Sequence, residues 1–173
     1  MPRVMERFDD HRGQDAGRFS MYVASYLSGY TDGEGCFTVS FSPRIKLRTG
    51  WEVRPSFSVS QNADRSEVLQ LMLEYFGCGG IRPDRSDRTL KYEVRDLGHL
   101  LERVIPHFER YPLLSGKRGD FLRFAKVCEL IRVRAHLTEP GLRTIVELAL
   151  AMNISGRRKF TAERLLEHRN LKL

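Results

Sequence analysis

The chain has 173 residues, of which 41% are hydrophobic and 29% charged, and its formal net charge is +7. This length corresponds to one domain of ordinary size, large enough to bury a core. Its apolar runs are far shorter than the roughly 20 residues that span a bilayer, and the first residues lack the apolar stretch of a secretion signal, so we expect no membrane partner. The basic charge suits a polyanionic partner.

The first half of the chain predicts a helix, two strands and a second helix. We interpret residues 1–19 as a mobile polar tail and residues 20–173 as a single domain. Ser20 can cap a helix that runs to about Tyr30, with apolar residues one helical turn apart. From residue 36 the apolar period changes to two, which predicts a strand to about residue 44 and, after a turn, another over residues 52–60. Asp64 can cap the next helix, which Gly77 ends.

The second half predicts two short strands, near residues 80–84 and 89–95, followed by helices. We expect these helices at about residues 97–109, 119–135, 140–152 and 162–168. The order αββαββα, with C-terminal helices added, is typical of an α+β fold. It indicates one four-stranded antiparallel sheet that is backed by helices on one face.

The opposite face of this sheet would carry polar and basic side chains. Such a face offers hydrogen-bond donors, acceptors and positive charge to DNA bases and phosphates. An ordinary solvated sheet face has the same alternation, and periodicity does not separate the two interpretations. The residues placed on this face by alternation are Thr38, Ser40, Ser42, Arg44, Lys46, Arg54, Ser56, Ser58, Ser60, Arg82, Lys91, Glu93 and Arg95.

The segment Tyr26–Phe37, with the sequence YLSGYTDGEGCF, is the most unusual stretch of the chain. Small residues recur at every fourth position, Ser25, Gly29 and Gly33, and such a row lets two helix backbones approach closely. The helix ends in Asp-Gly-Glu-Gly, where a carboxylate and a backbone carbonyl can jointly hold a hard divalent cation. Without further context, these residues favour a simpler interpretation, a solvated turn at a helix end.

The segment LSGYTDGEG, residues 27–35, resembles the defining motif of the LAGLIDADG homing endonucleases, and the αββαββα order matches the fold of that family. In that family, chains with one motif form homodimers whose motif helices pack side by side. Each helix contributes one acidic residue to a central active site. The resemblance therefore implies that this chain pairs with itself through an interface that includes Ser25, Gly29, Asp32 and Gly33.

The resemblance also implies a catalytic set. The last acidic residue of the motif is the metal ligand, here Glu34, and Gly33 offers its backbone carbonyl. The cofactor implied is Mg²⁺, for which Ca²⁺ or Mn²⁺ can substitute in the site. The segment SVSQNADR resembles the one that supplies a water-positioning side chain and a basic residue, which fall on Gln61 and Arg65. The segment YPLLSGKR resembles the region of the active-site lysine, Lys117.

DNA contacts are implied for the open sheet face and for the segment NISGRRKF, which resembles a loop that touches backbone phosphates. The predicted DNA-binding residues are Thr38, Ser40, Ser42, Arg44, Lys46, Arg54, Ser56, Ser58, Arg82, Asp84, Lys91, Glu93, Arg95, Ser155, Arg158 and Lys159.

The function implied is that of a site-specific homing endonuclease encoded by a mobile intron. Such an enzyme binds a long, near-palindromic double-stranded DNA target as a homodimer, hydrolyses one phosphodiester in each strand and leaves short 3′ overhangs. The alternative is a non-cleaving nucleic-acid-binding protein of the same fold, either an intron maturase or a DNA-binding regulator. A maturase would add intron RNA to the partners. The presence of residues at all four catalytic positions favours the endonuclease.

The place of action implied is intracellular and DNA-associated. Arginine outnumbers lysine by 23 to 6, a bias that GC-rich genomes produce. This bias favours a bacterial cytoplasm over an organelle.

Overall fold

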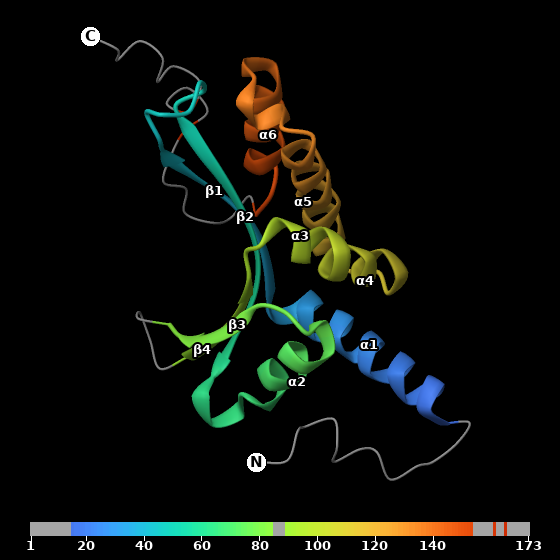
Figure 1. Ribbon diagram of the computed structural model, residues 1–173. Coiled ribbons are helices and arrows are strands. Elements are labelled where there is room, and N and C mark those ends of the chain that lie inside the picture. The colour runs from blue at the N-terminus through green and yellow to red at the C-terminus, as the bar shows by residue number, and fades with distance from the viewer. Residues whose placement is uncertain (1–14, 85–88, 154–160, 162–164, 166–173) are drawn as a thin grey trace. The chain divides into compact units, whose positions relative to one another are not determined.

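The computed structural model describes residues 15–84, 89–153, 161 and 165. Figure 1 shows the order of elements, which confirms the predicted αββαββα core of an α+β fold. None of the helices in the described part of the chain has the length and hydropathy that crossing a bilayer requires. The elements are α1 (Asp15–Glu34), β1 (Gly35–Pro43), β2 (Trp51–Asn62), α2 (Glu67–Phe76), β3 (Gly80–Pro83), β4 (Thr89–Val94), α3 (Leu97–His99), α4 (Ile105–Arg110), α5 (Lys117–Arg132) and α6 (Glu139–Leu150).

Helix α1 is longer at both ends than the sequence predicts. It begins at Asp15, so Ser20 is not its N-cap and the predicted tail of residues 1–19 overlaps the helix. It continues past Tyr30 to Glu34, and Thr31 in its last turn is fully buried. Tail residues 1–14 and most of the predicted helix 162–168 lie outside the described residues.

The start of α2 and the interior of the next helical segment differ from the prediction. Strand β2 runs to Asn62 and a 3₁₀ turn, Ala63–Arg65, follows it, so Asp64 lies in this turn and Ser66 occupies the N-cap position of α2. Helices α3 and α4 form one helical segment through a π-helical turn at Leu100–Val104. Pro106 directly follows the start of α4 and has no N–H for an α-helical bond, which explains the change of register before it.

The strands of the described chain form one sheet in the order β1-β2-β4-β3. Strand β4 pairs antiparallel with β2, where Val59 faces Tyr92, and with β3, where Ile81 faces Tyr92. The neighbouring row on the other face joins Ser58, Glu93 and Gly80. This register places apolar and polar side chains on opposite faces, as the alternation predicts.

The chain divides into two compact units. One comprises the residues up to Cys36 together with Phe57–Arg118, and the other comprises Phe37–Ser56 together with the residues from Gly119 onward. Strands β1 and β2 each begin in one unit and end in the other. The predicted single domain from residue 20 onward thus contains two units, each with a core of its own.

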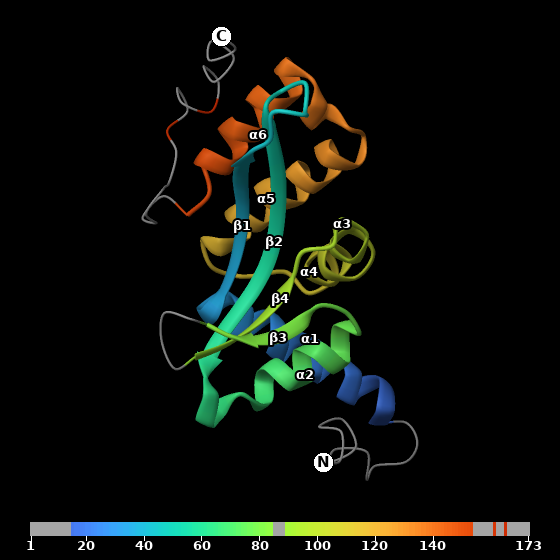
Figure 2. The same cartoon turned by 60° about the vertical axis from the view of Figure 1, so that its left-hand side comes forward.

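The core of the first unit is aromatic. Phe57 of β2 meets Phe76 of α2, Tyr92 of β4 and Phe108 of α4 edge to face, with ring centroids 6.0, 6.3 and 5.4 Å apart. Figure 2 shows β3 and β4 beside α2, which packs on them. Gly77 ends α2 at a φ of 58°, a backbone conformation that favours glycine, so its predicted role is confirmed.

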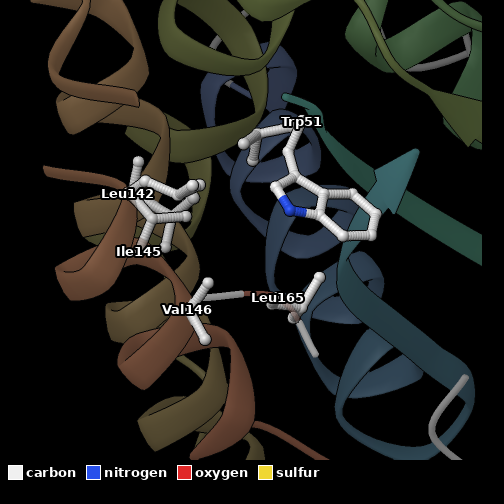
Figure 3. Close-up of a cluster of buried hydrophobic side chains, with 7 residues drawn as sticks. Trp51, Leu142, Ile145, Val146 and Leu165 are labelled. Atoms are coloured by element: carbon white, nitrogen blue, oxygen red, sulfur yellow. The ribbon is translucent and has the colours of Figure 1, made fainter. Parts of the chain in front are cut away.

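The core of the second unit packs α5 and α6 against the first half of β2 (Figure 3). Its members are Trp51, Val53, Val127, Leu142, Ile145, Val146 and Leu165, all buried. Phe37 of β1 packs on Phe121 and Phe124 of α5, with ring centroids 5.5 and 5.2 Å apart. In both units the odd-numbered residues of β2 face the helices, which confirms the predicted buried face.

A buried histidine joins three helices of the first unit. Ser28 of α1 donates to the Tyr111 carbonyl at 2.7 Å, so its oxygen is left to accept from Nε2 of His107, 3.1 Å away. Nδ1 of His107 then accepts from the Tyr75 hydroxyl at 3.0 Å. The imidazole is thereby satisfied in its neutral form, and burial lowers the pKa of His107 to about 4.

This histidine makes the stability of the protein depend on pH. Above pH 6.5 His107 is neutral whether the chain is folded or unfolded. As the pH falls from about 6.5 to about 4, only the unfolded chain takes up the proton, so the free energy of unfolding decreases, by up to about 3 kcal/mol. We expect urea denaturation between pH 7 and pH 4 to show a smaller decrease for His107→Gln than for the wild type. His99→Gln, at an exposed histidine, is the control, and an equal pH dependence in all three proteins would contradict this assignment.

Candidate functional site

The C-terminal end of α1 turns directly into β1. Glu34 is the last residue of the helix and is exposed, and Gly35 is the first residue of the strand. A Cβ atom at Gly35 would lie 2.4 Å from Cγ2 and 2.7 Å from the carbonyl oxygen of Thr31. Only glycine allows this close approach, so Gly35 fixes the tight turn that follows Glu34 and thereby the position of the Glu34 side chain at the end of the helix.

Lys117, at the start of α5, reaches the same helix end from a distant part of the sequence. Its Nζ donates to the carbonyl oxygens of Gly35 at 2.6 Å, Thr31 at 3.1 Å and Gly33 at 3.2 Å. The last carbonyls of a helix lack partners within the helix and carry partial negative charge, so an ammonium is well placed there. The structure thus brings Lys117 to the residues on both sides of Glu34.

Asp32 holds the segment before Lys117 in place. Its carboxylate accepts from the backbone N–H groups of Leu114 and Ser115, at 3.0 and 2.9 Å, and from the Ser115 hydroxyl at 2.5 Å. The Ser115 oxygen in turn accepts from the Lys117 N–H at 3.1 Å. Partial burial opposes ionisation, but these bonds and nearby Lys117 together lower the pKa of Asp32 below its usual value. The sequence assigns Asp32 to a dimer interface, whereas its oxygen atoms form bonds within the chain.

Gln61 also lies next to the end of α1, because its side-chain amide donates to the hydroxyl of Tyr30 in the last turns of the helix. Arg65 lies exposed in the 3₁₀ turn after β2, and within the described part of the chain it makes no hydrogen bond to this cluster. The structure therefore brings together four of the predicted residues, Gly33, Glu34, Gln61 and Lys117. Tyr30 and Ser115 are additions that no local sequence pattern indicated.

The groups at this helix end include oxygen ligands that fit a hard divalent cation. The Glu34 carboxylate and the Gly33 carbonyl are ligands of the kind that such ions prefer. Lys117 uses one lone pair of the Gly33 oxygen and leaves the other available. Among the described residues, no group of three or more His, Cys, Asp or Glu side chains could hold a metal.

One face of α1 is exposed and combines aromatic with small residues. Tyr22 and Tyr26 are 60% and 52% exposed. A Cβ at Gly29 or Gly33 would meet nothing within 4 Å. An open pocket of about 300 Å³ adjoins this face and is lined by Ser25, Ser28, Gly29 and Asp32 of α1 and by Arg110–Leu114.

The polar face of the sheet carries charged side chains that pair with one another. Glu93 pairs with Arg82 and Arg95, and Lys91 pairs with Asp84 at 3.1 Å. Glu52 pairs with both Arg44 and Arg54, and the hydrogen bond from Arg54, followed by that from Arg44, lowers the pKa of Glu52. The alternation places Glu52 on this face, but only the structure shows that it holds two arginines.

Several hydroxyl groups of this face also form hydrogen bonds within the protein. Thr38 and Ser56 bond to each other at 2.8 Å, and Ser40 donates to the Arg54 carbonyl at 3.2 Å. Ser58 lies on this face beside Glu93, as predicted, but it is in a central strand and only 8% exposed. Ser42 is half-buried and Lys46 is exposed in the loop after β1. Ser155, Arg158 and Lys159 lie outside the described residues.

Comparison with known proteins points to a single family. A family model described as LAGLIDADG endonuclease matches residues 27–128. The chain is 32% identical over 152 residues to homing endonuclease I-ApeII of Aeropyrum pernix, a match that covers 84% of this chain and 89% of that protein. It also resembles probable intron-encoded endonucleases 2 and 3 of Neurospora crassa, at 32% and 33% identity, but spans only 29% and 24% of their length. These fungal relatives do not support the predicted preference for a bacterial host.

Solved structures agree with this similarity. The crystal structure of the homing endonuclease I-TnaI is 32% identical, with a TM-score of 0.77 over 84% of this chain and 96% of that one. I-SmaMI, bound to its uncleaved DNA target in the presence of calcium ions, is 30% identical with a TM-score of 0.74. That match covers 86% of this chain and 49% of I-SmaMI.

The contacts of Lys117 lead to a prediction about stability. Lys117→Met leaves the carbonyls of Thr31, Gly33 and Gly35 without their charged donor, so we expect the free energy of unfolding to decrease by about 2 kcal/mol. Lys126→Met, at an exposed position of the same helix, is the matched control and should stay within about 0.5 kcal/mol of the wild type. Equal urea midpoints for the two variants would show that Lys117 does not hold the helix end.

Proposed function

The chain belongs to the LAGLIDADG endonuclease family, and from this premise we propose that it is a site-specific homing endonuclease that cuts double-stranded DNA as a homodimer with Mg²⁺. In this proposal it binds a long, near-palindromic target, hydrolyses one phosphodiester in each strand and leaves short 3′ overhangs. The observation that carries the proposal is the meeting of Lys117 with the helix end that bears Glu34, although 82 or more residues separate Lys117 from these carbonyls.

The homodimer is supported by the exposed face of α1. The small residues Ser25, Gly29 and Gly33 form a row along which a second helix backbone can approach, and the exposed rings of Tyr22 and Tyr26 border that row. A two-fold axis beside this face would bring two copies of Glu34 together. It would also bring the carboxylate and carbonyl ligands of both copies to one place.

Each residue at the helix end has a role suited to phosphodiester hydrolysis. Glu34 and the Gly33 carbonyl would hold divalent cations, which supply Lewis acidity toward the attacking water and the leaving oxygen. Lys117 places positive charge where negative charge develops on the phosphoryl group. Gln61, fixed by Tyr30, has one amide N–H left with which to orient water. We assign Arg65 the same electrostatic role as Lys117, with a side chain free to turn toward bound DNA.

The polar sheet face is the DNA-binding surface in this proposal. Its arginines are outward-facing on a rigid support, as bidentate contacts to bases and phosphates require. The protein would accordingly be DNA-associated.

The second candidate function is that of a binding protein of the same fold, such as an intron maturase that binds RNA. The chain spans only 29% and 24% of the length of the two Neurospora relatives, so the activity of those proteins does not transfer directly. Nucleic-acid binding without Mg²⁺-dependent cutting, in wild type and Glu34 variant alike, would favour this candidate.

The catalytic assignment predicts the effect of Glu34→Gln. The purified protein is incubated with duplex DNA that spans candidate intron-insertion junctions, either with Mg²⁺ or with EDTA. We expect the wild type to cut both strands only with Mg²⁺. Glu34→Gln should still bind the DNA but cut it at least about 100-fold more slowly, because a ligand is lost. Glu102→Gln makes the same charge change at another exposed position; if Glu34→Gln cuts as fast as this control, the site is misassigned.

The dimer assignment predicts the effect of bulk on α1. Gly29→Leu adds a side chain where nothing lies within 4 Å, so the monomer should fold with equal or greater stability, since leucine favours helix more than glycine does. The same side chain would keep two α1 helices apart. In sedimentation velocity we therefore expect a dimer for the wild type and for Gln70→Leu, on the exposed face of α2, and a monomer for Gly29→Leu. A dimer in all three proteins would contradict this interface.

A further inference from the structure

Glu93, at the centre of the polar sheet face, holds two arginines at once. Arg82 of β3 donates to its Oε2 through Nε at 3.1 Å and through Nη2 at 2.9 Å. Arg95, just after β4, donates through Nη2 to Oε1 at 3.1 Å, and its Nε lies 2.9 Å from Oε2. Both guanidinium groups are therefore fixed through the same edge, the one formed by Nε and Nη2.

This arrangement leaves a defined set of donors free on each arginine. A guanidinium has five N–H groups. Glu93 accepts two hydrogen bonds from Arg82; from Arg95 it accepts one, and it also forms an ion pair with Nε of Arg95. The three N–H groups on Nη1 and on the outer side of Nη2 are not used by Glu93, and together they form the end of each side chain. Two parallel N–H bonds from such an end match O6 and N7 of guanine, which are adjacent acceptors in the major groove. Adenine presents a donor in place of O6, so a fixed guanidinium discriminates against it.

The position of Glu93 suits a supporting residue rather than a DNA contact. Its side chain is 11% exposed, whereas those of Arg82 and Arg95 are 48% and 64% exposed. The register places it between Ser58 and Gly80 of the adjacent strands, so its backbone is held from both sides. The carboxylate is thus covered and the two cations face outward.

We propose that Glu93 is a positioning residue for DNA specificity, which fixes Arg82 and Arg95 so that each reads one guanine in the major groove. The inference rests on the proposed function, because it requires that the sheet face binds DNA. In this inference Glu93 affects DNA binding in two opposite ways. The carboxylate repels phosphates and so weakens binding to DNA of any sequence, while the fixed arginines strengthen binding to guanine at their own positions.

The second arginine pair of the sheet provides a matched control. Arg44 and Arg54 each give one donor to the same oxygen of Glu52, through Nη1 at 2.9 Å and Nη2 at 2.7 Å. Arg82 by contrast gives two donors to Glu93, and Arg95 contacts both of its carboxylate oxygens, so Glu52 restrains the direction of its partners less than Glu93 does. Glu52→Gln and Glu93→Gln remove the same charge from the same face.

The experiment selects bound duplexes from a double-stranded DNA library with a randomised core and sequences them, for the wild type and the two variants. We expect the wild type to prefer guanine at two positions of each half-site and Glu93→Gln to lose about tenfold of that preference. Glu52→Gln should retain the preference at these positions. Both variants should bind random-sequence DNA more tightly at low salt, with a salt dependence of log K steeper by about one.

Two further variants separate specificity from folding. Arg82→Lys and Arg95→Lys keep both the charge and Glu93 but replace the planar fork with a single ammonium, so each should abolish guanine preference at one position with an unchanged salt slope. Two results would overturn the inference and leave the proposed function standing. One is that Glu93→Gln keeps the wild-type preference for guanine. The other is that the wild type does not select guanine at any position that these variants alter. A wild type that selects no sequence at all overturns both.

Discussion

The ammonium of Lys117 among three backbone carbonyls is the contact on which the candidate site depends. The last carbonyl groups of α1 carry partial negative charge and lack hydrogen-bond partners within the helix. The ammonium of Lys117, at the start of α5, donates to them. Asp32 and Ser115 hold the intervening segment so that the two ends meet. Because this contact lies on both sides of Glu34, it also determines where the carboxylate is exposed.

The proposed dimer would place two copies of this helix end side by side. Each copy would contribute the Glu34 carboxylate and the Gly33 carbonyl as oxygen ligands. The outer face of α1 has room for such an approach, because a Cβ atom at Gly29 or Gly33 would meet nothing within 4 Å and Tyr22 and Tyr26 are exposed. In this proposal one two-fold axis would both cover the exposed face and bring the two sets of ligands together.

In the proposed function, the polar sheet face would combine attraction to DNA with restraint of the groups that read it. Its arginines provide the positive charge, Glu52 and Glu93 neutralise part of that charge, and Glu93 restrains the direction of two arginines. A flexible basic surface would bind any duplex through its phosphates. Fixed guanidinium groups bind fewer sequences, because their donors match acceptors in only one geometry.

The sequence alone determined the features of this protein that depend on local spacing. The change of apolar period near residue 36 fixed the helix-to-strand transition, the alternation fixed which side of β2 is buried, and the motif around Gly33 and Glu34 indicated the family. The tertiary structure decided what depends on competition between distant groups. Helix α1 continues to Glu34, with Thr31 fully buried in its last turn. Ser58 is buried although it lies on the polar face of the sheet. Lys117 binds carbonyls at the end of α1, and Glu93 pairs with two arginines, one before it and one after it in the sequence. The spacing of residues along a chain indicates which face of a helix or strand each residue occupies. It does not determine hydrogen-bond partners, because segments far apart in the sequence compete for the same donors and acceptors in the folded protein.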